Sequence, residues 1–148
     1  MNKTIYLAYG SNLNLEQMAQ RCPTAKPIGT VVLQDYQLLF RGRNGGAVAT
    51  VEPVKDSSVP VLLWEITPAD ELALDRYEGF PFLYRKEKVK IKLGRKAVET
   101  MVYIMNDGKP LGIPSCYYYS VILDGYKSAQ FDVGVLKKAV KDSTEDSQ

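Results

Sequence analysis

The sequence predicts an α+β fold in which a small, mixed but mostly antiparallel β-barrel is flanked by short helices. About five runs of strand-forming residues follow one another, and three or four short helical segments lie at their ends. So many strands in so few residues tend to curl until their edges are covered. The chain has 148 residues, 45% of them hydrophobic and 24% charged, which is typical of one globular domain spanning residues 1–148.

The first unit is predicted to be a strand, a tight loop and a helix. Residues 3–9 are rich in strand formers and end at Gly10, where polar residues follow. Asn14 is placed to cap a helix, with Gln17 at capping-box spacing, and Pro23 ends that helix. A short polar loop therefore joins the first strand to the first helix.

Most of the chain between residues 29 and 105 is predicted to form antiparallel strands separated by turns. Asn44-Gly45-Gly46 and Gly94 mark two of these turns, because such residues tolerate positive φ. Alternating apolar and polar residues identify the strands between the turns. The predicted strands are 31–40, 46–51, 60–66, 84–93 and 97–105.

One helix with clear boundaries interrupts these strands. Thr67 is predicted as its N-cap, Pro68 as its first residue and Gly79 as its C-terminal stop. Acidic residues in its first turn complement the helix dipole. The helix is therefore predicted over residues 68–78.

Two further helices are predicted near the C-terminus. Pro114-Ser115 can begin one that runs to Leu123, and Asp132 can cap another that runs through Val140. Residues 141–148 are polar and are predicted to form a frayed tail.

Charge and cysteine content exclude several classes of protein. The 19 basic and 17 acidic residues give a net charge of +2, without the wide one-signed patch that binds nucleic acid. Cys22 and Cys116 lie far apart, with no Cys-x-x-Cys spacing. No apolar stretch approaches the roughly 20 residues that cross a membrane, and no apolar leader opens the chain. The prediction is a cytoplasmic protein without nucleic-acid or membrane partners.

The absence of histidine narrows the possible chemistry. Without it, neither a Ser-His-Asp triad nor a histidine-based zinc site can form. The chain also lacks a Gly-x-x-x-x-Gly-Lys motif and a Gly-x-Gly-x-x-Gly loop after its first strand, the usual phosphate-binding signatures. Proton transfer is therefore assigned to Asp, Glu, Lys, Tyr or Cys side chains.

The loop Tyr9-Gly10-Ser11-Asn12 is the first candidate binding site. It joins a strand to a helix, where free N–H groups and the helix dipole attract anions. Gly10 lets a ligand approach the main chain, and Ser11 and Asn12 add short polar side chains. The alternative is a tight connection with an Asx-type turn and no ligand.

Glu78 is the candidate catalytic residue. It occupies the last turn of the central predicted helix, where the negative end of the helix dipole disfavours a carboxylate. This field, together with the aromatic residues among positions 77–82, is expected to raise the pKa of Glu78, which suits a general acid or base. The alternative is an ordinary surface ion pair between Glu78 and Arg76 or Lys86.

Structural roles are predicted for the other notable residues. Asp75, on about the same helix face as Glu78, is predicted to hold Arg76 or a backbone group. The run Tyr117-Tyr118-Tyr119 is predicted mainly to pack, with one hydroxyl able to reach a ligand. Trp64 is predicted to lie in the core.

Four segments, in this order, resemble the gamma-glutamylcyclotransferase family. They are Tyr6-Leu7-Ala8-Tyr9-Gly10-Ser11-Asn12-Leu13, Arg21-Cys22-Pro23, Leu74-Asp75-Arg76-Tyr77-Glu78-Gly79 and Pro114-Ser115-Cys116-Tyr117-Tyr118. The resemblance implies a small β-barrel with flanking helices. It also implies cleavage of a small-molecule gamma-glutamyl amide by the substrate's own α-amine, which releases 5-oxoproline and a free amine or amino acid. No cofactor or metal is implied, and nothing in the sequence indicates the oligomeric state.

The resemblance also assigns roles to individual residues. Glu78 is implied to be the catalytic residue. The implied substrate-binding residues are Tyr6, Leu7, Ala8, Tyr9, Gly10, Ser11, Asn12 and Tyr118. This agrees with the chemistry, because an α-ammonium group is inert until a base such as a carboxylate of raised pKa takes its proton. The attack closes a five-membered ring, so holding the substrate folded can supply much of the catalysis.

The identity of the departing amine stays open at this point. Free gamma-glutamyl amino acids, gamma-glutamyl-lysine isopeptides and a glutamyl-protected metabolite on a carrier share the same reacting bond. Residues 80–84, after Glu78, are where variation is expected to shape the pocket for the departing group. Two alternatives without catalysis also stay open: a module that binds a gamma-glutamyl or carboxylate ligand, and a structural domain with no ligand.

Overall fold

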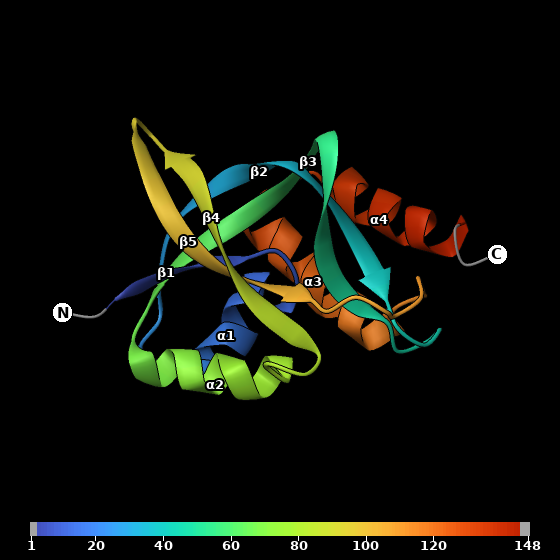
Figure 1. Cartoon of the computed structure of the whole chain (residues 1–148), viewed down its shortest axis with the longest axis horizontal. Coiled ribbons are helices and arrows are strands. Elements are labelled where there is room, and N and C mark those ends of the chain that lie inside the picture. Colours follow the sequence, from blue (N-terminus) through green and yellow to red (C-terminus); the bar gives the residue numbers. More distant parts are fainter. Residues whose placement is uncertain (1–2, 146–148) are drawn as a thin grey trace.

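The computed structural model describes residues 3–145, which form a mixed sheet with helices packed around it (Figure 1). The α+β fold predicted from the sequence is confirmed. In chain order the elements are β1 (Thr4–Ala8), the 3-10 helix η1 (Ser11–Leu13), α1 (Leu15–Arg21), β2 (Lys26–Arg41), β3 (Val48–Ile66), α2 (Pro68–Glu78), β4 (Tyr84–Leu93), β5 (Lys96–Met105), α3 (Cys116–Ser128) and α4 (Val133–Glu145).

The short strand β1 lies at the centre of the sheet, whose strand order is β2-β3-β1-β5-β4. It pairs antiparallel with β3 and parallel with β5. Strands β2 with β3, and β4 with β5, form antiparallel hairpins. Because β1 is flanked on both sides, the loop that follows it emerges in the middle of the molecule, and this placement creates the site described below.

The sheet curls as the predicted closed or nearly closed barrel requires, but within the described residues it does not close fully. Within residues 3–145 no ladder joins the outer strands β2 and β4. Their ends approach each other without pairing, since a Cβ placed on Gly29 would lie 3.5 Å from Leu93 Cδ1. The free edge of β4 carries exposed Lys88, Lys90 and Lys92, and charges of this kind protect an unpaired edge without closure.

The strands predicted at 46–51 and 60–66 are one continuous strand, β3. The polar residues between them form a bulge against β2, where the register shifts between Gln34 and Tyr36. Asp35 and Asp56 both adopt positive φ there, and the Asp56 N–H donates to Asp35 Oδ1 at 2.9 Å. A bulge accommodates extra residues without ending the ladder, so turn-like residues do not end the strand here.

Helix α2 has the boundaries that the sequence predicts. The Thr67 side chain accepts a hydrogen bond from the Asp70 N–H, while the Asp70 carboxylate accepts one from the Thr67 N–H. Gly79 ends the helix in the left-handed conformation, with φ of 67°. Asn14 also caps α1 as predicted, by accepting from the Gln17 N–H.

The two C-terminal helices are longer than predicted. Helix α3 begins after the N-cap Ser115 and runs to Ser128, beyond the predicted end at Leu123. Helix α4 continues to residue 145, so residues 141–145 do not form the predicted frayed tail, and residues 146–148 lie outside the described part of the chain. The cause is Ser143, which is fully buried and accepts a hydrogen bond from the Phe40 N–H of β2 at 2.8 Å.

Helix α3 packs directly against η1 and so supports the loop that follows β1. Gly125 makes this contact possible, because a Cβ at this position would lie 2.7 Å from both Leu13 C and Leu13 Cβ. Helices α1 and α2 lie next to each other beside the sheet, and α4 packs on β2 (Figure 1).

We expect Gly125→Ala to lower the free energy of unfolding by about 1–3 kcal/mol, the usual cost of an added methyl group in a packed interior. The added methyl must push α3 away from the backbone of Leu13. Chemical denaturation measures the loss. Gly46→Ala is the matched control, because its Cβ would meet nothing closer than 3.8 Å, and an equal loss in both variants would contradict the explanation.

Candidate active site

A small cavity with about 260 Å³ of empty space opens beside the loop after β1. Residues from strands β1, β3 and β4, from helices α2 and α3, and from the loop meet there. The lining residues are Tyr6, Tyr9, Gly10, Ser11, Asn12, Ala49, Glu78, Tyr84 and Tyr118.

The structure brings most of the predicted site residues together. Glu78 and Tyr118, which lie far from the loop in sequence, both line the same cavity as the loop. Leu7 and Ala8 do not line it: both are buried in the core at 0% and 1% exposure, so their contribution is to hold β1 in place.

The loop is held rigidly by contacts on several sides. The Leu13 N–H donates to Gly10 O at 3.0 Å and closes η1. The Trp64 indole N–H donates to Asn12 O at 3.1 Å, so Trp64 is a core residue, as predicted, that also anchors the loop. A Cβ on Gly10 would lie 3.3 Å from Ala49 Cβ, so a larger residue would require Ala49 to move by a few tenths of an ångström.

The four tyrosine hydroxyls around the cavity differ in how their hydrogens are used. Tyr9 donates to Tyr103 O at 2.7 Å, and Tyr84 donates to Ala49 O at 2.5 Å.

The other two hydroxyls act as acceptors instead. Tyr118 accepts from the Ala49 N–H at 3.1 Å, and Tyr6 accepts from Asn12 Nδ2 at 2.9 Å. Among residues 3–145, no acceptor takes the hydroxyl hydrogens of Tyr6 and Tyr118. These two hydroxyls can therefore donate to a ligand in the cavity.

Glu78 is partly buried at the C-terminal end of α2 and carries the only acidic side chain that lines this cavity in the described structure. Burial raises the pKa of Glu78 to about 7, and the positive charge of Arg21 opposes the rise. No donor or cation within residues 3–145 pairs with its carboxylate. A carboxyl group in this state can both take and return a proton near neutral pH.

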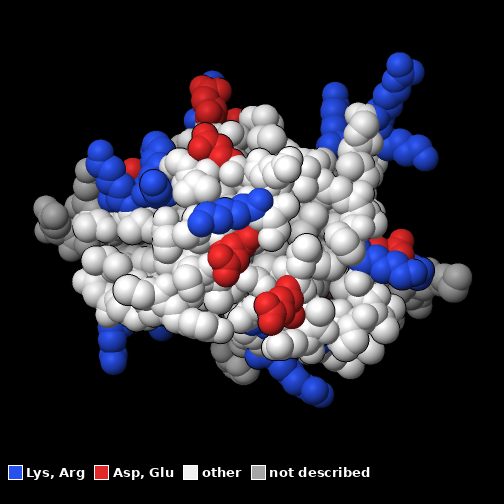
Figure 2. All heavy atoms as spheres, turned by 180° about the vertical axis from the view of Figure 1, so that it is seen from behind, with Lys and Arg blue, Asp and Glu red and all other residues white. Residues whose placement is uncertain are grey.

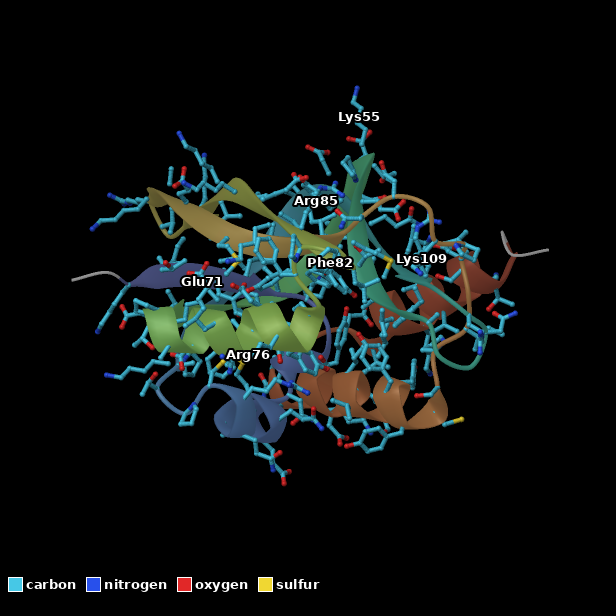
Figure 3. The ribbon with its side chains drawn as sticks, turned by 60° about the horizontal axis from the view of Figure 1, so that its bottom comes forward. Lys55, Glu71, Arg76, Phe82, Arg85 and Lys109 are labelled. Carbon is cyan, nitrogen blue, oxygen red and sulfur yellow. The ribbon has the colours of Figure 1, made fainter. Side chains whose placement is uncertain are left out.

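Of the aromatic residues predicted to surround Glu78, Phe82 does not do so. Phe82 is 89% exposed in the connection after α2 (Figure 3) and cannot shield Glu78. Phe80 packs against Tyr103 and beneath the Lys86 ammonium. Glu78 shares its cavity with four tyrosines, which come from β1, the loop, β4 and α3.

The alternative ion pair between Glu78 and Lys86 does not form. Lys86 pairs instead with Glu71 at 2.6 Å and Asp75 at 2.9 Å, and Asp75 also accepts from the Tyr103 hydroxyl at 2.6 Å. Asp75 thus has the predicted structural role, although with different partners. Glu71 lies on α2 away from the cavity (Figure 3).

Four residues near the cavity were not predicted. Ala49 and Tyr84 line it, while Arg21 and Tyr77 contact the loop from outside. Tyr84 begins β4 and reads locally as an ordinary strand residue. Only the path of the chain in three dimensions reveals these positions.

On the face seen in Figure 2, basic and acidic side chains are scattered over a mostly uncharged surface. Residues 3–145 contain no group of three acidic or cysteine side chains arranged to hold a metal ion. The helices within this range are also too short or too polar to span a bilayer.

Comparisons with known proteins point to one family. Residues 6–120 match the family model described as gamma-glutamyl cyclotransferase, AIG2-like. A human protein named gamma-glutamylcyclotransferase is 29% identical over 133 residues, which cover 83% of this chain and 70% of the human protein. A bovine protein of the same name is 32% identical over 82 residues, covering 51% of this chain and 44% of its own length.

Solved structures agree with this match. One called gamma-glutamyl cyclotransferase superposes with a TM-score of 0.80 at 26% identity, covering 93% of this chain and 86% of its own. YkqA from Bacillus subtilis has a TM-score of 0.79 at 20% identity, covering 97% of this chain and 55% of its own, and this likeness concerns the fold alone. The family match spans most of the chain and includes every cavity-lining residue. The chain therefore belongs to the gamma-glutamyl cyclotransferase, AIG2-like family.

Proposed function

We propose that this protein is a gamma-glutamyl cyclotransferase. The α-amine of the glutamyl group attacks its own gamma-amide carbonyl, the amide C–N bond breaks, and 5-oxoproline and a free amine or amino acid are released. The observation that carries the proposal is the position of Glu78: a carboxylate with no partner among residues 3–145 shares a small cavity with the loop after β1.

Glu78 acts as the base and then as the acid. The α-ammonium must lose a proton before it can attack, and the raised pKa of Glu78 makes the carboxylate a suitable acceptor. The α-nitrogen loses one proton before the attack and a second after the ring has closed. The departing nitrogen gains these two protons, so it leaves as an ammonium group. No net proton is consumed.

The loop and the tyrosines hold the substrate in a folded conformation. Gly10 leaves the main chain bare, and the free hydroxyl hydrogens of Tyr6 and Tyr118 can bind the substrate carboxylate or the oxyanion that forms at the attacked carbonyl. Because the attack is intramolecular, holding the amine against the carbonyl replaces most of the work of bringing two reactants together. In this proposal the glutamyl part of the substrate lies against the loop, Glu78 and the tyrosines of the cavity, and the departing amine lies toward its opening.

The direct test is to incubate the purified protein with a panel of gamma-glutamyl compounds and to measure 5-oxoproline. The panel includes gamma-glutamyl amino acids, gamma-glutamyl-lysine isopeptides and gamma-glutamyl amides of small amines. Release of 5-oxoproline from at least one supports the proposal. Saturable binding without release would indicate a binding module, and neither binding nor release would contradict both functions.

We expect Tyr118→Phe to lower kcat/KM about 10- to 100-fold, the usual effect of removing one hydrogen bond to a charged group. The phenyl ring keeps its edge-to-face contact with Phe40, whose ring centre lies 6.4 Å away, so the fold should survive. Steady-state kinetics and a thermal melt measure the two effects. Tyr117→Phe is the matched control, because the Tyr117 side chain is 71% exposed and does not line the cavity. Equal losses in both variants would contradict the role of Tyr118.

A further inference from the structure

One side chain outside the cavity contacts the lining residue Asn12 directly. It is also linked to Tyr6 through Asn12 and to Ser11 through Tyr77. This is Arg21, the partly buried last residue of α1. Its Nη1 donates to Asn12 Oδ1 at 2.6 Å, and its Nη2 donates to Gln17 Oε1. Its guanidinium carbon lies 3.5 Å from the centre of the Tyr77 ring, and the Tyr77 and Ser11 hydroxyls are hydrogen bonded at 2.9 Å.

The contact with Arg21 fixes the orientation of the Asn12 side-chain amide. A guanidinium group has donors and no acceptor, so the atom of Asn12 that faces it must be the oxygen. The nitrogen of the same amide therefore faces Tyr6 and donates to its hydroxyl at 2.9 Å. The Tyr6 oxygen is thus an acceptor toward Asn12, and its hydrogen stays free for the cavity that Tyr6 lines.

The partners of Arg21 are unusual for a residue that only stabilises the fold. A structural arginine would be expected to pair with a carboxylate, which its planar fork matches. No carboxylate in residues 3–145 lies within ion-pair distance of Arg21, which binds two amide oxygens and an aromatic face instead. Asn12 is only 2% exposed, so its orientation is decided by these contacts and not by solvent.

We propose that Arg21 is a positioning residue that, through Asn12, makes the Tyr6 hydroxyl a hydrogen-bond donor to the gamma-glutamyl substrate. The acceptor is an oxygen of the glutamyl group, either its carboxylate or the attacked carbonyl. Through Tyr77 the same side chain holds Ser11. This assignment deepens the proposed function and rests on it for the identity of the substrate.

The hydrogen-bond direction can be tested without substrate by nuclear magnetic resonance. With ¹³C at the hydroxyl-bearing ring carbon of tyrosine, the Tyr6 resonance reports the hydrogen bonding of its oxygen. Arg21→Met should move this resonance, because the Asn12 amide loses the contact that orients it. Arg76→Met is the matched control, since Arg76 is an exposed arginine on the neighbouring helix α2 (Figure 3), and it should leave the resonance in place. An unmoved Tyr6 resonance in Arg21→Met would overturn the proposal.

Asn12→Asp tests the same direction by reversing it. The carboxylate keeps the shape of the amide and can pair with Arg21, but it can only accept, so it takes the Tyr6 hydrogen away from the cavity. We expect a folded protein with kcat/KM lowered about 10- to 100-fold, similar to Tyr6→Phe. A folded Asn12→Asp variant with full activity would also overturn the proposal.

A double-mutant cycle links Arg21 to Tyr6. Arg21→Met and Tyr6→Phe should each lower kcat/KM, and the double variant should lose clearly less than the product of the two losses, because both changes remove one shared interaction. A remaining loss from Arg21→Met is expected, since Arg21 also holds Ser11 through Tyr77 and its charge acts on Glu78. Losses that multiply would show that Arg21 acts independently of Tyr6 and would contradict the proposal. If Arg21→Met moves the Tyr6 resonance as expected but the wild type releases no 5-oxoproline, the proposed function fails while the positioning by Arg21 stands.

Discussion

Replacing Glu78 with Gln should reduce kcat about 10²- to 10⁴-fold, the range that a positioned acid-base group contributes. The amide preserves the shape of the side chain at the end of α2 but cannot take the proton from the α-ammonium group. Substrate should therefore still bind in the cavity, and KM should change little by comparison. Release of 5-oxoproline at saturating substrate measures the loss.

The pH dependence of the wild type gives Glu78 a second signature. Because the pKa of Glu78 is raised to about 7, its base form accumulates as the pH rises through 7, and kcat/KM should rise over the same range. Glu71→Gln is the matched control, since Glu71 lies on the same helix but outside the cavity. It should retain both the turnover and the rising limb. Near-normal turnover by Glu78→Gln would remove Glu78 from the mechanism.

Elements defined by local signals were predicted well from the sequence. Helix α2 is specified by Thr67, Asp70 and Gly79, whose capping interactions involve only neighbours in the chain. The bulge in β3 was missed because its turn-like residues are accommodated by pairing with β2, which local reading does not include. The extension of α4 was missed for the same reason: buried Ser143 binds Phe40, about a hundred residues earlier.

The candidate site could be predicted only in part. The loop after β1 and Glu78 were both identified, and the structure brings them to one cavity. The raised pKa of Glu78 was expected for an incomplete reason, since nearby Phe82 is 89% exposed, while Tyr84, distant in sequence from the loop, lines the same cavity as Glu78.

Arg21 shows why distant contacts stay hidden in a sequence. Its role depends on which atom of Asn12 faces it and on the position of Tyr77, which is brought close by the packing of α1 beside α2. Neither spacing nor residue type indicates such a contact. Residues that act through another side chain therefore need coordinates before they can be assigned.

Glu78→Gln should also change the stability of the protein in a pH-dependent way. The pKa of Glu78 is about 7 in the folded protein, against 4.5 for an unperturbed glutamate. A raised carboxyl pKa means that the folded state binds a proton that the unfolded state has already lost. The free energy of unfolding contributed by this group is therefore fully present below pH 4.5 and is lost as the pH rises to about 7.

The amide cannot ionise, so the variant escapes this loss. At about 1.36 kcal/mol per pH unit, the interval from 4.5 to 7 corresponds to about 3 kcal/mol. Urea unfolding at pH 4.5, 5.5, 6.5 and 8 measures the free energy of unfolding of both proteins. The value for Glu78→Gln minus that for the wild type should increase with pH by up to this amount and become constant above pH 7. Glu16→Gln, which alters an exposed glutamate on α1, should show a constant difference. Parallel curves for Glu78→Gln and the wild type would mean that Glu78 is well solvated. A well-solvated carboxylate would have an ordinary pKa, and both the proposed proton transfer by Glu78 and the predicted pH dependence would lose their basis.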